Sequence, residues 1–242
     1  MNHGGHRGST VQDSSFVSSV VESFMRKAFG PLVLVVGALF VAAPYFIAQA
    51  PYESTMGLIQ KIMYFHVPSW IAMYAAIFVC GVSSAIYLFQ NKAAADRYAV
   101  SAAELTVLFG SMGLVTGPLW GRKAWGVWWE WDVRLTSALL LELIFVAYLL
   151  VRKYGGPGSE KLAAAAALFG MAVAPFVYKS VDIWRTVHPK TSVVPTLPRM
   201  MAGPLALTAL AFLLLFFVLL TLRARLAERQ AVLDELYLAH ED

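Results

Sequence analysis

Long apolar stretches alternate with short polar segments along the whole chain. Most of the stretches contain about 17–21 residues, the length that a helix needs to cross a ~30 Å hydrocarbon layer at ~1.5 Å per residue. The apolar residues are continuous rather than alternating with polar ones, which favours helices over a β-barrel. The sequence therefore predicts an all-α integral membrane protein surrounded by lipid, with six transmembrane helices at about 31–49, 70–90, 99–118, 137–151, 162–178 and 203–222.

The chain divides into a membrane domain and two flanking tails. Residues 31–222 form the predicted six-helix domain, which includes a tryptophan-rich segment at 119–136. Residues 1–30 form an N-terminal tail, in which apolar residues at helical spacing over 16–29 predict an amphipathic helix. Residues 223–242 predict a C-terminal tail that extends the last span as a helix.

An even number of spans places both tails on one side of the membrane. The loops between spans 1–2, 3–4 and 5–6 then lie on the opposite, outer side. Of the 19 Lys and Arg residues, eleven lie on the side of the tails and eight on the outer side. The positive-inside rule therefore predicts that both termini are cytoplasmic. Outer loops without a function normally carry few Lys and Arg residues. The eight on this side therefore indicate that positive charge has a function there, such as binding an anionic group.

Five of the seven tryptophans lie within twelve residues of the tryptophan-rich segment. This segment is too polar for hydrocarbon, and its indoles suit either stacking on a flat apolar ligand or anchoring at the bilayer surface. By parity all seven tryptophans lie on the outer side, whereas an anchoring belt normally marks both sides. The i, i+3, i+4, i+7 spacing within the segment predicts a short amphipathic helix with three indoles on one face. Its positions are Trp125, Trp128, Trp129 and Asp132, with Trp120 ahead of them and Trp131 turned elsewhere.

Two histidines of the outer side are candidate ligands. His66 precedes the second span and His188 lies in the last outer loop, each near a helix end. Two neutral imidazoles are a common axial pair for haem iron, whereas a lone interfacial histidine is more often an ordinary hydrogen-bonded side chain. Asp132 would lie within reach of Arg134 or of an imidazole. The basic side chains that would pair with haem propionates are Arg122, Lys123, Arg134 and Arg185.

Composition narrows the choice of function. The single cysteine, Cys80, excludes an intramolecular disulfide and a CxxC redox pair. A net charge of +4 with a mean hydropathy of +0.63 gives no reason to expect nucleic-acid binding. Glu104 and Glu142 lie inside apolar spans, where ionisable groups are functional candidates, although we favour structural roles for both.

The tryptophan-rich segment and both histidine contexts resemble one family of haem-handling membrane proteins. The run WGVWWEWDVRLT matches the WWD signature of that family, WGxxWxWDxRLT. The contexts IMYFHVP and RTVHP are similar to those of the CcmC family, the C subunits of the cytochrome c maturation system, over roughly 31–222. The matching signature positions are Trp125, Gly126, Trp129, Trp131, Asp132, Arg134, Leu135 and Thr136.

This resemblance implies a function in haem delivery rather than an enzyme activity. Members of the family hold haem b at the periplasmic surface of the bacterial inner membrane and help to load it onto the haem chaperone CcmE. They work beside the CcmA/CcmB ATP-driven transporter and the small protein CcmD. By the same resemblance, His66 and His188 are the expected axial ligands. The tryptophan-rich segment is then the periplasmic surface for haem and chaperone.

Other functions stay open from the sequence. The chain could be a subunit that translocates haem, but it contains no GxxxxGK[ST] segment, so an ATPase partner would have to drive transport. It could also be a docking scaffold for the chaperone that does not ligate iron itself. An electron-transfer cytochrome b is disfavoured, because both histidines lie at one surface instead of deep between facing helices. The chain is also small for an enzyme that attaches haem to apocytochrome.

Overall fold

The computed structural model describes the backbone of residues 8–241 and the side chains of residues 27–240. Helices account for most of this part of the chain, and two short 3₁₀ helices, η1 (Leu58–Ile62) and η2 (Val194–Thr196), lie in loops. Six helices are long and apolar enough to cross a membrane, which confirms the predicted fold class. They are α1 (Gly8–Gln49), α2 (Met63–Gln90), α3 (Ala93–Ala124), α4 (Val133–Tyr154), α5 (Ser159–Ile183) and α6 (Arg199–Glu241).

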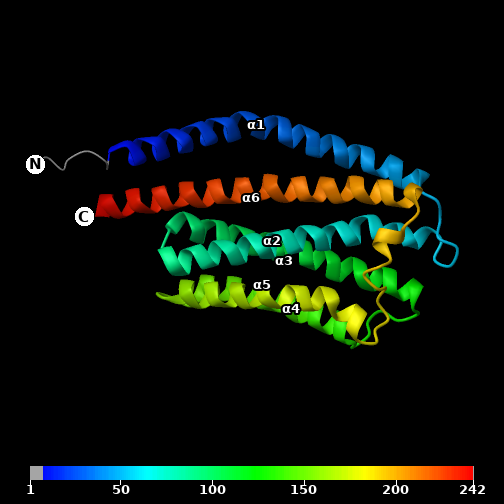
Figure 1. Cartoon of the computed structure of the whole chain (residues 1–242). Coiled ribbons are helices and arrows are strands. Elements are labelled where there is room, and N and C mark those ends of the chain that lie inside the picture. The colour runs from blue at the N-terminus through cyan, green and yellow to red at the C-terminus, as the bar shows by residue number, and fades with distance from the viewer. Residues whose placement is uncertain (1–7, 242) are drawn as a thin grey trace, which may run out of the picture.

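The helices pack in three adjacent pairs, α1 with α6, α2 with α3, and α4 with α5 (Figure 1). α2 lies in the middle of the bundle and packs against α3, α5 and α6. α1 begins and α6 ends at the same end of the bundle, in agreement with an even number of crossings. The connections between α1 and α2, α3 and α4, and α5 and α6 meet at the other end, which we call the loop end.

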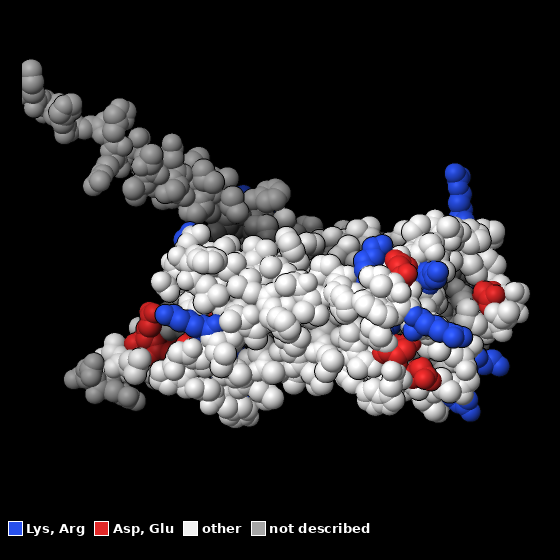
Figure 2. Space-filling model, turned by 60° about the horizontal axis from the view of Figure 1, so that its bottom comes forward, with Lys and Arg blue, Asp and Glu red and all other residues white. Residues whose placement is uncertain are grey.

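Charged side chains concentrate at the two ends of the bundle. Figure 2 shows Lys, Arg, Asp and Glu near both ends of one face, with a wide uncharged band between them. Far from the loop end, Arg223 of α6 donates to both carboxylate oxygens of Glu104 on α3, at 2.5 and 2.6 Å. Asp96 of α3 pairs with Arg152 of α4 at 2.6 Å. These two pairs join helices to one another, so Glu104 has a structural role.

Some helix boundaries differ from the sequence prediction. The 3₁₀ helix η1 leads directly into α2, so His66 lies inside the first turn of α2 instead of ahead of the span. The predicted tail helix over 16–29 is continuous with the first span within α1, and its side chains up to residue 26 lie outside the described part. The last span continues as predicted, because α6 extends to Glu241.

Four glycines of α3 leave room for side chains of other elements. They are spaced three or four residues apart, so they lie on one face of the helix. A Cβ atom at Gly113 would lie 2.5 Å from the Trp70 ring, and one at Gly117 would lie 3.3 Å from the His66 ring. The four neighbouring pairs are Gly110 with Glu142, Gly113 with Trp70, Gly117 with His66, and Gly121 with Trp125. The absence of side chains on this face therefore allows the rings at the loop end to pack against α3.

Candidate functional site

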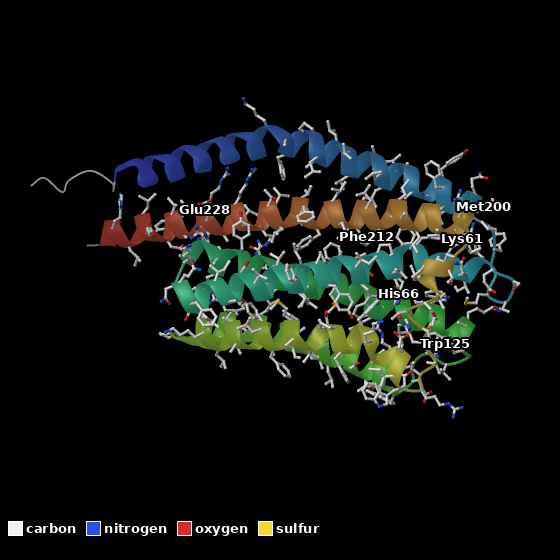
Figure 3. All side chains as sticks on the ribbon, in the orientation of Figure 1. Lys61, His66, Trp125, Met200, Phe212 and Glu228 are labelled. Carbon is white, nitrogen blue, oxygen red and sulfur yellow. The ribbon has the colours of Figure 1, made fainter. Side chains whose placement is uncertain are left out.

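The loop end contains a cavity of about 290 Å³, close to the lower limit for small-molecule sites. α2, α3, α4 and α5 form its walls, and the loop between α5 and α6 covers one side. Figure 3 marks His66 and Trp125 at this end of the bundle. The lining is mainly apolar, and its polar side chains include His66, Tyr74, Arg134, Tyr178, His188 and Lys190.

One ring nitrogen of His66 is hydrogen-bonded, and the other has no hydrogen-bond partner among the described side chains. The residue is only 7% exposed, and its Nδ1 lies 3.0 Å from the Thr116 hydroxyl of α3. That hydroxyl donates its own proton to the carbonyl of Met112 at 2.7 Å, so it accepts from His66 Nδ1–H. The hydrogen-bond pattern therefore places the proton of a neutral His66 on Nδ1 and leaves the Nε2 lone pair available to a ligand.

His188 has the same arrangement, although it lies in a loop. Its Nδ1 is 2.9 Å from the carbonyl oxygen of Pro189, which can only accept, so Nδ1 carries the proton. Burial, and secondarily the nearby Arg134 guanidinium, lower the pKa of His188 to about 4. The imidazole is therefore neutral at pH 7, with the Nε2 lone pair free. Both histidines thus meet the requirements of a metal-ligating imidazole around one cavity.

Arg134 places a positive charge on the wall of a mainly apolar cavity. Its Nη1 donates to the carbonyl of Val177 on α5. Among the residues whose side chains are described, no carboxylate lies within ion-pair distance of this guanidinium. Tyr74 and Tyr178 line the cavity as well, with ring centroids 6.2 Å apart. The anionic part of a ligand would therefore meet a guanidinium that has not been neutralised.

The tryptophans of the segment divide into two sets. Trp120 and Trp125 line the cavity with ring centroids 5.8 Å from His66 and 6.2 Å from His188, respectively, and Trp129 lines it too. Trp128 and Trp131 do not line the cavity, and they are 58% and 75% exposed. The first set can stack on a ligand inside the cavity, whereas the second set presents apolar area to a partner or to the membrane surface.

The predicted short helix over residues 125–132 is wrong. α3 ends at Ala124, Trp125 caps it, and Gly126 takes a left-handed φ of +82° that does not continue a helix. The chain then stays irregular up to Asp132, whose carboxylate accepts from the Leu135 N–H at 2.8 Å and caps α4. The indoles are therefore distributed over two surfaces instead of sharing one helical face.

Several charged residues that the sequence suggested lie outside the cavity lining. The Arg122 guanidinium donates to the Gly126 carbonyl and so fixes the turn after α3. Lys123 and Arg185 are exposed and do not line the cavity. The carboxylate of Asp132 accepts hydrogen bonds from Leu135, Thr186 and Val187, rather than from Arg134 or an imidazole as expected. Arg134 alone of the four proposed anion partners therefore faces the cavity.

Four aromatic or basic residues of the lining were not proposed as site residues from the sequence. Trp70 and Tyr74 follow His66 at four-residue intervals, so the helical periodicity of α2 would have found them. Tyr178 and Lys190 reach the cavity through the packing of α5 and of the following loop, for which the sequence gives no local signal. Glu142 is 4% exposed, accepts from the Ser111 hydroxyl at 3.0 Å and does not line the cavity.

Comparisons with known proteins identify the family of this chain. The family model of heme exporter protein C, CcmC, matches residues 14–235. The heme exporter protein C of Bradyrhizobium diazoefficiens is 38% identical over 71% of this chain and 68% of that protein. The corresponding proteins of Escherichia coli and Haemophilus influenzae are 32% and 30% identical, over 73% and 82% of both chains, respectively. With a family model that spans nearly the whole chain and relatives of similar length, this protein belongs to the heme exporter protein C (CcmC) family.

Proposed function

We propose that this chain binds haem b between His66 and His188 and delivers it to the haem chaperone CcmE during cytochrome c maturation. The observation that carries the proposal is that two imidazoles line one cavity, each with Nδ1 engaged and Nε2 free. Neutral imidazole nitrogens in this state are suited to both axial positions of haem iron. Bis-imidazole ligation would hold haem without a covalent bond, as delivery requires.

The other lining residues fit the remaining parts of haem. Trp120, Trp125 and Trp129 offer indole faces for a flat macrocycle. The Arg134 guanidinium, which pairs with no described carboxylate, would bind a propionate, with Lys190 as a second cation of the lining. Haem, when bound, supplies an iron with two axial coordination positions. The residue types of the lining therefore support a haem site at this place.

Delivery requires a surface that an acceptor can reach. Trp128 and Trp131 supply exposed indole area beside the cavity, and we assign the docking of CcmE to them. We place the loop end in the periplasm and both termini in the cytoplasm of a bacterial inner membrane, because of the excess of basic residues on the side of the tails. The chain would act with the CcmA/CcmB transporter and CcmD, without catalysing bond formation itself.

Haem titration followed by transfer to the chaperone tests both parts of the proposal. The purified full chain in detergent should bind one haem with a low-spin, six-coordinate spectrum, and it should pass this haem to the soluble, haem-free domain of CcmE. The double variant Trp128→Ala/Trp131→Ala should keep haem and lose transfer, whereas Trp125→Ala/Trp129→Ala should bind haem weakly. A wild-type chain that binds no haem would refute the function. Full transfer by the Trp128→Ala/Trp131→Ala variant would refute the docking surface alone.

Thr116→Val tests how His66 is held. The variant keeps the shape of the side chain but removes the acceptor for His66 Nδ1–H, so the orientation of the ring is no longer fixed. Loss of an outer partner of a metal-ligating histidine typically weakens metal binding by roughly 10–100-fold. We expect the haem Kd to rise by about tenfold in titrations at pH 7, while Thr116→Ser, which keeps the hydroxyl, remains close to wild type. Equal affinity of the two variants would show that the hydroxyl has no such role.

A further inference from the structure

The carboxylate of Asp132 connects the tryptophan-rich segment to the loop that carries His188. Its Oδ1 accepts from the Leu135 N–H at 2.8 Å, which caps α4. Its Oδ2 accepts from the Val187 N–H at 3.1 Å and from the Thr186 hydroxyl. One carboxylate oxygen thus caps a helix, while the other holds two consecutive residues from a segment more than fifty positions further along the chain.

The same set of hydrogen bonds reaches the backbone of His188. The N–H of His188 donates to the Thr186 hydroxyl oxygen at 3.1 Å, and that hydroxyl in turn donates to Asp132. The imidazole is then oriented by the hydrogen bond that its Nδ1–H donates to the carbonyl of the next residue, Pro189. The position of the His188 ring therefore follows from the position of the Asp132 carboxylate.

A ligating histidine in a loop depends on such hydrogen bonds for its position more than a histidine in a helix does. The residues between α5 and η2 have no regular backbone ladder, so few main-chain bonds set the place of His188. His66, in contrast, lies within the first turn of α2. Hydrogen bonds to a carboxylate are about twice as strong as those between neutral groups. The bonds to Asp132 are thus a main restraint on this part of the loop.

We propose that Asp132 is a positioning residue for the His188 ligand, and that it touches neither haem nor the chaperone. Its carboxylate does not line the cavity, and three donors already occupy its oxygens. Because His188 is a ligand only under the proposed function, this role of Asp132 rests on that function. The tryptophan-rich segment then contributes an anchor for the second axial ligand as well as indole faces.

Asp132→Asn separates the two roles of the carboxylate. Asparagine caps helices about as well as aspartate, so its amide oxygen can keep the bond to Leu135 N–H. Its amide nitrogen cannot accept from Val187 N–H or from the Thr186 hydroxyl. Thr186→Val removes the hydroxyl link between Asp132 and the His188 N–H, while the cap and the bond from Val187 N–H stay, and Thr186→Ser retains the hydroxyl. Glu130→Gln removes one negative charge from the same segment and serves as the matched control.

The first measurement uses the haem-free full chain in detergent. Amide hydrogen exchange followed by mass spectrometry should show faster exchange over residues 186–188 in Asp132→Asn and Thr186→Val than in wild type. Thr186→Ser and Glu130→Gln should exchange as wild type does. Unchanged exchange in both Asp132→Asn and Thr186→Val would overturn the proposal without reference to haem.

The second measurement is the visible and electron paramagnetic resonance spectrum with haem added. Asp132→Asn and Thr186→Val should shift toward the spectrum of His188→Ala, with a haem Kd about tenfold above wild type, the lower end of what lost outer partners cost. If His188→Ala itself leaves the spectrum unchanged, the axial ligation in the proposed function fails. If His188→Ala changes the spectrum and both other variants do not, the positioning role fails alone. A shift in Glu130→Gln equal to that in Asp132→Asn would also overturn it, since charge would then explain the effect.

Discussion

Purified His66→Ala and His188→Ala proteins are expected to lose the low-spin, six-coordinate spectrum of the wild-type haem complex. Each variant removes an Nε2 lone pair that the proposed site would present to iron, and among the described residues the cavity lining contains no third imidazole. The loss of an outer partner of a ligating histidine already costs roughly 10–100-fold in metal affinity, so we expect the haem Kd to rise by more than about 100-fold. Haem titrations with visible and electron paramagnetic resonance spectra would measure both changes.

Two features of the His variants separate ligation from misfolding. The wild-type size-exclusion profile and helical circular dichroism should be kept, since neither ring belongs to the apolar core clusters. Added imidazole should restore a low-spin spectrum by filling the vacated position. His240→Ala, a change far from the cavity, should bind haem as wild type does. A low-spin complex of normal affinity in both His66→Ala and His188→Ala would move the iron ligands elsewhere.

Gly113→Leu is expected to destabilise the whole bundle. A Cβ atom at this position would lie 2.5 Å from Trp70 Cε2 and 2.6 Å from Trp70 Nε1, well inside van der Waals contact. The rigid indole cannot bend away as the end of a flexible side chain would, so α2 and α3 have to separate. Overpacking of this kind costs about 3 kcal/mol. For a domain of this size that corresponds to a fall in Tm on the order of 10 °C, measurable by thermal unfolding in detergent.

The same substitution at an open glycine gives the control for Gly113→Leu. A Cβ atom at Gly37 of α1 meets nothing within 4 Å, and the residue lies on the exposed face of that helix. Gly37→Leu should therefore leave the Tm close to that of wild type. Haem binding should weaken in Gly113→Leu but not in Gly37→Leu, because Trp70 lies beside His66 on the cavity wall. Equal melting temperatures for both variants would contradict the close packing of α2 on α3.

The sequence predicts the membrane helices well because nearly every residue of a helix that crosses lipid has to be apolar. The signal therefore extends over the whole length of the helix. The sequence predicts the ends of those helices less well, since polar residues such as Gln60 and Lys61 stand within the 3₁₀ turn that leads into α2. The apolar period of the tryptophan-rich segment was misleading for a different reason. Gly126 takes a positive φ that ends the helical backbone, although the spacing of the indoles around it is that of a helix.

The candidate site could be predicted only in part. His66, His188 and Arg134 were found because unusual residue types stand out in apolar surroundings, and all three line the cavity. The tie between Asp132 and Thr186 could not be predicted, because two segments distant along the chain come together only through the packing of α4 and α5. An aspartate in the sequence can either contact a ligand or hold a loop by hydrogen bonds, and its residue type alone does not distinguish these two roles.

The placement of one histidine in a helix and the other in a loop makes the two proposed ligands unequal in how readily they can leave. His66 can withdraw only if the first turn of α2 unwinds or shifts against Thr116 and Gly117. His188 can swing away once the hydrogen bonds of its loop to Asp132 open, with every membrane helix left in place. An acceptor that offers its own ligand would thus exchange first at the His188 face of the iron. The cargo would remain tethered by His66 until the new bond has formed, so it would never be free in solution.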